Sequence, residues 1–322
     1  MGGRAIATSD DFFAPMSSLV KPEPPIFVPG KYTTRGKWMD GWESRRRRTP
    51  GHDWCVIKLG MRGRIRGVDV DTSHFTGNHP SHCTIEAIDS ARGVTAAIAA
   101  ASGESWTEIL PRSGLRGDSH NYFALDEGLY ADRPWTHVRL NIIPDGGVGR
   151  LRVYGEAVVD WRRAARGGAP IDLADIRLGG LVIAASDMHF GAKDNMIMPG
   201  RGRNMGDGWE TRRRRGPGHD WAIVRLGTTG LLARIEIDTT HFKGNYPDRA
   251  SVEGCIARGA TLADFGSVDW FEVLPSVKLR PHFRHVFARE LASSGPVTHV
   301  RLNIFPDGGI SRFRVYGTLA PA

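Results

Sequence analysis

A fifteen-residue segment occurs twice in this chain, and this duplication constrains the fold more than any other feature. The first copy runs from Asp40 to Trp54 and reads Asp-Gly-Trp-Glu-Ser-Arg-Arg-Arg-Arg-Thr-Pro-Gly-His-Asp-Trp. The second copy, residues 207–221, differs from it only at the positions of Ser44 and Thr49. A chain that repeats so long a motif is expected to fold as two copies of one structural unit.

Two shorter motifs follow each copy in the same order. Asp-Thr-x-His-Phe-x-Gly-Asn occupies residues 71–78 and returns at 238–245. Val-Arg-Leu-Asn-Ile-x-Pro-Asp-Gly-Gly occupies residues 138–147 and returns at 300–309. The duplication therefore extends over most of the chain and is not confined to one loop.

Length and composition predict where the repeats divide. Single hydrophobic cores usually stop growing near ~250–300 residues, which favours two domains for a chain of 322 residues. An Arg-Gly-Gly-Ala-Pro stretch between the repeats is typical of a loop. We therefore predict a first repeat over residues 1–159, a linker over 160–177 and a second repeat over 178–322.

Short runs that read as strands follow each arginine motif, first at Cys55–Leu59 and then at Arg64–Val70 and Ala233–Ile237, where apolar and polar residues alternate. A period of two residues is typical of strands with one buried face. Pro-Asp-Gly-Gly between two strand-like runs predicts a hairpin, because glycine accepts positive φ. Helical patterns are limited to Gly93–Ala101 and Trp161–Arg166. The pattern predicts an all-β chain with one β-sandwich in each repeat.

The net charge of +8 raises the question of a nucleic-acid partner. Eight of the arginines lie in the two long motifs, which also contain Glu, His and Asp. A surface that binds a phosphate backbone usually lacks such carboxylates, because they repel it. A small anionic ligand is therefore favoured, and binding to RNA or DNA is the less favoured alternative.

Location is predicted from features that the chain lacks. It contains no apolar run of about 18 residues, so no membrane span is expected. The N-terminus lacks the apolar stretch of a secretory signal. The three cysteines form no Cys-x-x-Cys pair and no regular framework, so free thiols are expected. We predict a cytoplasmic protein.

The four consecutive arginines are the first candidate ligand-binding groups. In an extended segment alternate guanidinium groups face opposite sides, so at most two in each copy converge on a ligand. A planar guanidinium binds a carboxylate through two hydrogen bonds. Two alternatives stay open: a solvated charge run, or arginines that pair with nearby carboxylates to hold the loop. The substrate-binding candidates in this motif are Glu43, Arg45, Arg47, Glu210, Arg212 and Arg214.

Histidines next to aspartates are candidate acids and bases. An imidazole titrates near neutral pH, and an adjacent carboxylate can hold its tautomer. The alternatives are hydrogen bonds that satisfy loop backbone groups, or, for Asp-x-x-His, a pair of metal ligands. Asp-x-x-His alone is a weak metal signal. The candidate catalytic residues are His52, Asp53, Asp71, His74, His219, Asp220, Asp238 and His241, with Glu43 and Glu210 as alternates.

Amides and arginines near the strand ends complete the candidate set. Asn78 lies in a Gly-Asn turn, where its amide is available to a ligand. Arg139 and Asn141 alternate on one face of a predicted strand, which is either solvated or a wall of the pocket. Their counterparts are Asn245, Arg301 and Asn303. No nucleophile elbow, phosphate loop or dinucleotide fingerprint is present, which disfavours covalent serine chemistry and nucleotide use.

These motifs resemble those of the allantoicase (allantoate amidinohydrolase) family, and the resemblance runs from Ser9–Pro15 to Phe313–Gly317. It implies two tandem jelly-roll β-sandwich domains of the galactose-binding-like type. It also implies hydrolysis of allantoate to ureidoglycolate and urea, in the purine (allantoin) degradation pathway. A homo-oligomer is expected, because sandwich faces and edges need cover.

Allantoate carries one carboxylate and two ureido groups on a single carbon. An arginine fork can hold the carboxylate, whereas Asn, Asp or Glu can bond the ureido groups. Expulsion of urea requires a proton donor, and addition of water requires a base. No convincing metal-ligand spacing is present, so no built-in metal or other cofactor is expected, although a divalent ion could polarise a ureido carbonyl. The main alternative function is a non-catalytic β-sandwich that binds a carbohydrate or another small ligand.

Overall fold

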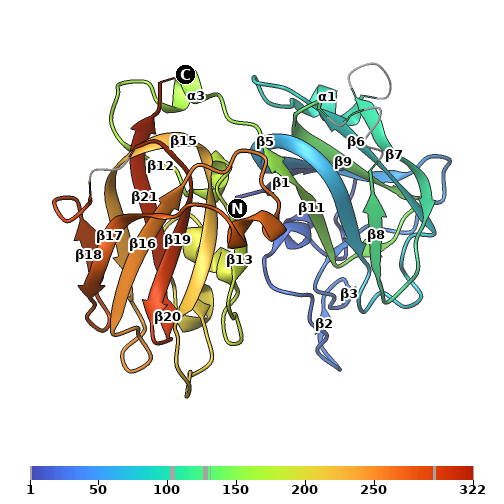
Figure 1. The fold of residues 1–322 in the computed structure, drawn as a ribbon. Coiled ribbons are helices and arrows are strands. Elements are labelled where there is room, and N and C mark those ends of the chain that lie inside the picture. The colour runs from blue at the N-terminus through green and yellow to red at the C-terminus, as the bar shows by residue number, and fades with distance from the viewer. Residues whose placement is uncertain (1, 102–105, 126–129, 131, 293–294, 322) are drawn as a thin grey trace. The chain divides into compact units, whose positions relative to one another are not determined.

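The computed structural model describes residues 2–101, 106–125, 130, 132–292 and 295–321. The chain divides into two compact units, Met1–Val158 and Val159–Ala322. Each unit is built almost entirely from antiparallel strands (Figure 1). The predicted all-β fold with a sandwich in each repeat is confirmed.

The first unit pairs its strands in two layers. The larger layer has the order β1 (Arg4–Thr8), β5 (Asp53–Asp71), β9 (Trp135–Ile143), β6 (His82–Ile88) and β7 (Thr107–Gly114). In the smaller layer β5 lies between β11 (Arg150–Ala157) and β8 (His120–Ala124). The short elements are η1 (Met16–Val20), β2 (Tyr32–Thr33), β3 (Gly36–Lys37), β4 (Trp42–Glu43), α1 (Ala96–Ala100) and β10 (Gly147–Val148).

Strand β5 belongs to both layers of the first unit. Its first part, residues 53–58, pairs with β1 and β9, whereas residues 63–71 pair with β11. The register shifts between Lys58 and Gly63, where the strand passes from one layer to the other. The carbonyl oxygen of Glu156 lies 2.5 Å from the place where a Cβ of Gly63 would be, so glycine is required at this crossing.

The second unit repeats this arrangement. Its larger layer has the order β13 (Leu181–Ala185), β15 (Asp220–Asp238), β19 (Val297–Phe305), β16 (Arg249–Cys255) and β17 (Phe271–Lys278). Its smaller layer contains β12 (Ile171–Asp172), β21 (Arg312–Leu319), the second part of β15 and β18 (Arg284–Phe287). The short elements are α3 (Trp161–Ala164), η2 (Ile176–Leu178), η3 (Lys193–Ile197), η4 (Met205–Asp207), β14 (Trp209–Glu210), η5 (Leu262–Gly266) and β20 (Gly309–Ile310).

The hairpin predicted at Pro-Asp-Gly-Gly is not formed, and this prediction was wrong. Strand β9 already has β5 and β6 on its two sides, so neither edge is open to the strand that follows. After the turn, β10 pairs with β4, and β11 joins β5 in the smaller layer. The turn therefore carries the chain from one layer to the other.

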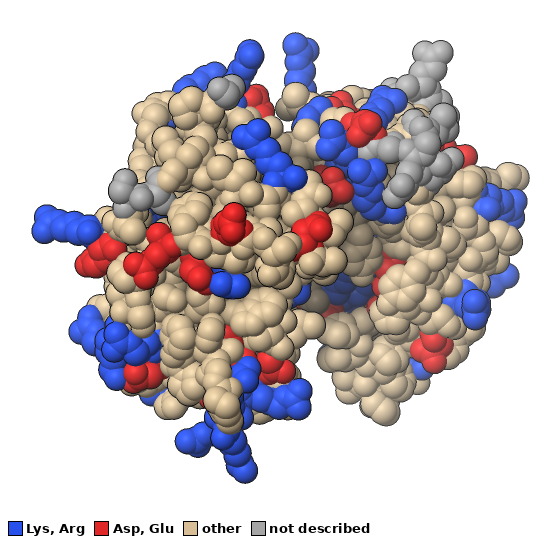
Figure 2. Space-filling view, in the orientation of Figure 1, with Lys and Arg blue, Asp and Glu red and all other residues tan. Residues whose placement is uncertain are grey.

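The directions of the side chains follow the alternation that the sequence predicts. Val138, Leu140 and Ile142 of β9 point into the core of the first unit, whereas the intervening polar residues face outward. The three cysteines are buried and unpaired, as expected. In the part of the chain that the structure describes, no helix is long and apolar enough to cross a membrane. Acidic residues lie among the lysines and arginines on the visible face (Figure 2).

Candidate functional site

The three duplicated motifs meet at one end of each sandwich, around a buried phenylalanine. Phe75 is fully buried and packs against the backbone of Gly41 and Gly147, and a Cβ at either glycine would overlap its ring. Phe242 has the same relation to Gly208 and Gly309 in the second unit. This packing accounts for the presence of these residues in both copies, because glycine alone lets the backbone approach the ring so closely.

Hydrogen bonds join the same three motifs into one rigid end. The Ser44 amide donates to the Gly146 carbonyl at 3.1 Å, and the Gly147 amide donates to the Asn78 carbonyl at 2.8 Å. The Arg47 amide donates to Asp145 Oδ2 at 2.8 Å. The second unit contains the matching bonds from Thr211, Gly309 and Arg214. Side chains carried by these loops are therefore held in fixed positions.

The predicted ligand-binding arginines hold carboxylates of their own unit. Arg45 Nη2 lies 3.2 Å from Asp10 Oδ1, and Arg47 Nη1 lies 3.0 Å from Asp53 Oδ1. Arg212 and Arg214 pair in the same way with Asp187 and Asp220. These contacts correspond to the alternative in which the arginines shape the loop. The other arginines of the motif, Arg46, Arg48, Arg213 and Arg215, are exposed.

The structure does not bring His52 and Asp53 together as a dyad. Asp53 is buried and accepts hydrogen bonds from Arg47 and from Ser9 Oγ, whereas His52 is exposed. Asp220 is held likewise, by Arg214 and Ser186. His219 instead lies with its Nε2 3.3 Å from Asn303 Oδ1 and packs on Phe305.

Asp71 and His74 are also held apart. Asp71 Oδ1 accepts the backbone N–H of Ser73 at 2.8 Å, whereas His74 Nε2 lies 3.2 Å from the Pro25 carbonyl. His74 has a positive φ of 71°, which turns its side chain away from the strand end. Asp238 and His241 repeat this arrangement with Thr240 and Gly202.

Glu43 and Asn78 do come together, in a cavity of about 320 Å³ in the first unit. Asn78 Nδ2 donates to Glu43 Oε1 at 2.7 Å. Lys37, from strand β3, and His74 line the same cavity. The other lining residues are Phe13, Gly36, Met39, Thr76 and Gly77.

The carboxyl group of Glu43 has an altered acidity. Burial raises the pKa of Glu43 above its ordinary value, and the Asn78 hydrogen bond and the positive charge of Lys37 offset only part of that rise. A half-buried carboxyl group whose pKa is shifted toward neutrality, in a cavity with an amide and an ammonium group, is a candidate general acid.

The second unit keeps the carboxylate and the amide but changes their surroundings. Asn245 Nδ2 donates to Glu210 Oε1, as in the first unit, and also approaches Met205 Sδ. Asn204 occupies the position, relative to the motif, that Lys37 has in the first repeat. The candidate acid of the second unit therefore has no ammonium group from this position.

A second cluster lies on the outer face of each larger layer. In the first unit Arg139 Nε and Asn141 Nδ2 both donate to Glu86 Oε2, each at 2.7 Å. Arg139 also donates to carbonyl oxygens of Ala99 and Ala101, so α1 covers it and leaves it 5% exposed.

In the second unit the equivalent cluster is open. Arg301 and Asn303 donate to Glu253 Oε2, each at 2.7 Å, and a cavity of about 410 Å³ gives access to them and to His219. The Trp270 ring lies 4.6 Å from the Arg301 guanidinium. Sequence reasoning missed Glu86 and Glu253. No strand was predicted at β6 or β16, where these glutamates lie opposite Arg139 and Arg301 on the neighbouring strand β9 or β19.

No group of three or more His, Cys, Asp or Glu side chains is placed to hold a metal ion among the described residues.

Strong likenesses to known proteins cover nearly the whole chain. A family model described as Allantoicase repeat matches residues 1–158 and 171–320. "Probable allantoicase 1" of Burkholderia mallei is 52% identical over 322 residues, which is 99% of this chain and 92% of that protein.

Other relatives and solved structures agree with this match. "Probable allantoicase" of Pseudomonas aeruginosa is 48% identical over 320 residues, which is 99% of this chain and 93% of that protein. The crystal structure of allantoicase from Saccharomyces cerevisiae has a TM-score of 0.80 at 36% identity. That match covers 98% of this chain and 90% of the yeast chain.

Proposed function

Because this chain belongs to the allantoicase family, we infer that it is a hydrolase that converts allantoate to ureidoglycolate and urea. The full-length matches to allantoicases carry this conclusion. Nothing in the part of the chain that the structure describes favours the alternative of a non-catalytic protein that binds a carbohydrate or another small ligand. The reaction belongs to purine degradation, through the allantoin branch.

We propose that the reaction takes place in the cavity around Glu43 in the first unit. Two of the rigidly joined motifs border this cavity, the arginine motif through Glu43 and the Asp-Thr-x-His motif through residues 74–78, and it contains a carboxyl group with a raised pKa. The Lys37 ammonium group is placed to neutralise the carboxylate of allantoate, and Asn78 to bond a ureido group. The Arg45 and Arg47 ion pairs hold the loop, so these arginines act as positioning residues in this proposal.

The chemistry then needs one carboxyl group in two protonation states. Protonated Glu43 donates its proton to the nitrogen of the departing ureido group, and the C–N bond breaks as the remaining ureido nitrogen pushes electrons toward carbon. Neutral urea leaves behind a protonated imine. The Glu43 carboxylate then takes a proton from water as its oxygen adds to that carbon. The product is ureidoglycolate, and Glu43 is protonated again.

The substitution Glu43→Gln tests this site. The amide keeps the size and the hydrogen bond of the side chain but has no proton to donate, so kcat for urea release should fall by about 10²–10⁴-fold. The measurement is urea formed from allantoate, with circular dichroism to confirm equal folding. Unchanged turnover would place the chemistry elsewhere, and absence of urea release from the unmodified protein would reject the function itself.

We also propose a cytoplasmic location for the enzyme. We propose a homo-oligomer as well, because the faces and edges of β-sandwiches need cover. The mass of the protein in solution, measured by light scattering after size exclusion, tests the second of these proposals. A mass of 35.4 kDa would identify a monomer.

A further inference from the structure

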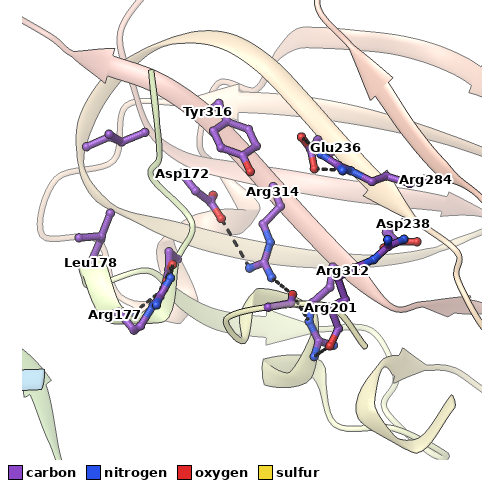
Figure 3. Close-up of a pocket in the computed structure, with 13 residues that line it drawn as sticks. Asp172, Arg177, Leu178, Arg201, Glu236, Asp238, Arg284, Arg312, Arg314 and Tyr316 are labelled. Atoms are coloured by element: carbon purple, nitrogen blue, oxygen red, sulfur yellow. Dashed lines mark hydrogen bonds and ion pairs between the residues drawn. The ribbon is translucent and has the colours of Figure 1, made fainter. Parts of the chain in front are cut away.

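A separate cavity of about 480 Å³ lies on the outer face of the smaller layer of the second unit (Figure 3). Strands β15, β18 and β21 contribute Glu236, Arg284 and Arg314 to it. Its other walls come from the segment 171–178 and from the loop at Gly200.

The floor of this cavity contains a guanidinium group that lacks one of its hydrogen bonds. Arg314 is 8% exposed, and its Nη2 donates to the backbone carbonyls of Met198 and Gly200. Its Nη1 is buried without a hydrogen-bond acceptor and lies 3.5 Å from Asp172 Oδ2. Because a buried donor without a partner is costly, an acceptor from a bound molecule would be stabilised here.

Acceptors are available beside this donor. Asp172 uses Oδ1 for the backbone amides of Ala174 and Val315, which leaves Oδ2 with only the long contact to Arg314. Burial raises the pKa of Asp172 to about 6. Asp238 is 4% exposed and uses Oδ1 for the Thr240 amide.

The charge balance of the lining selects the class of ligand. The arginines are Arg177, Arg201, Arg284, Arg312 and Arg314, and the carboxylates are Asp172, Asp175, Glu236 and Asp238. Such a balanced lining disfavours a multiply charged phosphate compound, which the carboxylates would repel. It suits a small molecule that presents one carboxylate to a guanidinium and N–H groups to the acids.

We propose that this cavity binds a small ureido acid, with its carboxylate on the Arg314 guanidinium and its ureido N–H groups on Asp172 and Asp238. The choice of ureido acids rests on the proposed function, because allantoate and ureidoglycolate both belong to that class. The site lies in the unit that does not contain the Glu43 cavity. It is therefore a second binding site of the enzyme for its own substrate class.

Calorimetric titration with N-carbamoylglycine tests the site. This probe has one carboxylate and one ureido group, and it lacks the second ureido group that the reaction expels. Propionate and urea each supply one half of the probe and should bind at least about tenfold more weakly, because each loses one set of charge-assisted hydrogen bonds. Equal binding of propionate would reject recognition of the ureido group.

Variants locate the bound probe. Arg314→Gln should weaken binding about tenfold or more, and Arg201→Gln, whose side chain is exposed at the rim, provides a second variant with little risk to folding. Arg289→Gln, an exposed arginine that does not line the cavity, is the matched control and should leave binding unchanged. Glu43→Gln should lower kcat for urea release by about 10²–10⁴-fold but leave this binding intact.

Two outcomes would overturn the proposal. One is the absence of binding to the unmodified protein at millimolar probe. The other is binding that Glu43→Gln removes and that Arg314→Gln and Arg201→Gln leave unchanged. Neither outcome depends on urea release, so failure of the proposed function is detected separately.

Discussion

At the scale of single residues, Lys37 contributes to the acidity of the proposed acid, together with burial and Asn78. Its positive charge lowers the pKa of Glu43, against the larger rise caused by burial. Lys37→Met should therefore raise the pKa of Glu43 further, and the protonated donor should persist to higher pH. In a plot of kcat against pH, the alkaline limb, where kcat falls, should move to higher pH. KM should rise about tenfold, because the contact with the substrate carboxylate is lost. An unchanged limb, or a shift to lower pH, would contradict this assignment.

His299 predicts how stability depends on pH. Burial, followed by the charge of Arg225, lowers the pKa of His299 to about 4, whereas an unfolded histidine titrates near ~6.5. The unfolded chain therefore binds a proton first as pH falls. The stabilising contribution is complete above pH ~6.5 and is lost progressively toward pH ~4, by about 3 kcal/mol. Urea denaturation of the wild type and of His299→Gln should show a smaller pH dependence for the variant, and parallel curves would exclude the effect.

The motifs predicted which residues gather but not how they pair. His52 and Asp53 are neighbours in the sequence, yet successive side chains at a strand start point to opposite sides, so Asp53 turns inward to Arg47. His74 is separated from Asp71 by its left-handed backbone, which the sequence does not specify. No sequence motif pointed to Lys37, because this residue lies outside the duplicated segment.

At the scale of elements, Arg150 joins β11 to the loop that precedes β4. It is 1% exposed and donates to Glu23 O, to Asp40 O and to Asp40 Oδ2, the last at 2.7 Å. Burial alone would raise the pKa of Asp40, but Lys21 and Arg150 together hold it below its ordinary value. The buried charge pair is therefore satisfied on both sides.

Removal of one partner should be costly. Arg150→Met leaves a buried carboxylate and several carbonyls without their donor, and it should lower the free energy of unfolding by about 3–5 kcal/mol. Chemical denaturation measures the change. Arg46→Met, at an exposed arginine of the duplicated motif, is the control and should stay within about 0.5 kcal/mol. A loss below about 1 kcal/mol for Arg150→Met would show that the ion pair between Arg150 and Asp40 does not hold the loop in place.

Element type was predictable from periodicity, whereas connectivity was not. The runs at Cys55–Leu59 and Arg64–Val70 read as two strands but form one, because Gly63 lets β5 cross between layers without a break. The turn at Pro-Asp-Gly-Gly has the composition of a hairpin. Its role depends on which strands already flank β9, and those strands come from distant parts of the chain.

At the scale of the whole molecule, duplication has given two similar units with different surroundings for the same groups. The carboxylate–amide pair is present in both, but Lys37 lies in the first repeat and Asn204 holds its place in the second. The cluster around Glu86 is covered by α1, whereas that around Glu253 is open. One repeat can therefore retain the chemistry while the other acquires a different use.

This difference predicts that a single repeat carries turnover. Glu210→Gln is the matched counterpart of Glu43→Gln, because both change a carboxyl group that accepts a hydrogen bond from an asparagine. Glu210→Gln should retain kcat for urea release within about threefold, and the double variant should be no slower than Glu43→Gln alone. If instead each single variant halves turnover and the double variant abolishes it, both repeats are catalytic. If each single variant abolishes turnover, the two carboxyl groups act in one reaction, and the assignment of chemistry to the first unit alone fails.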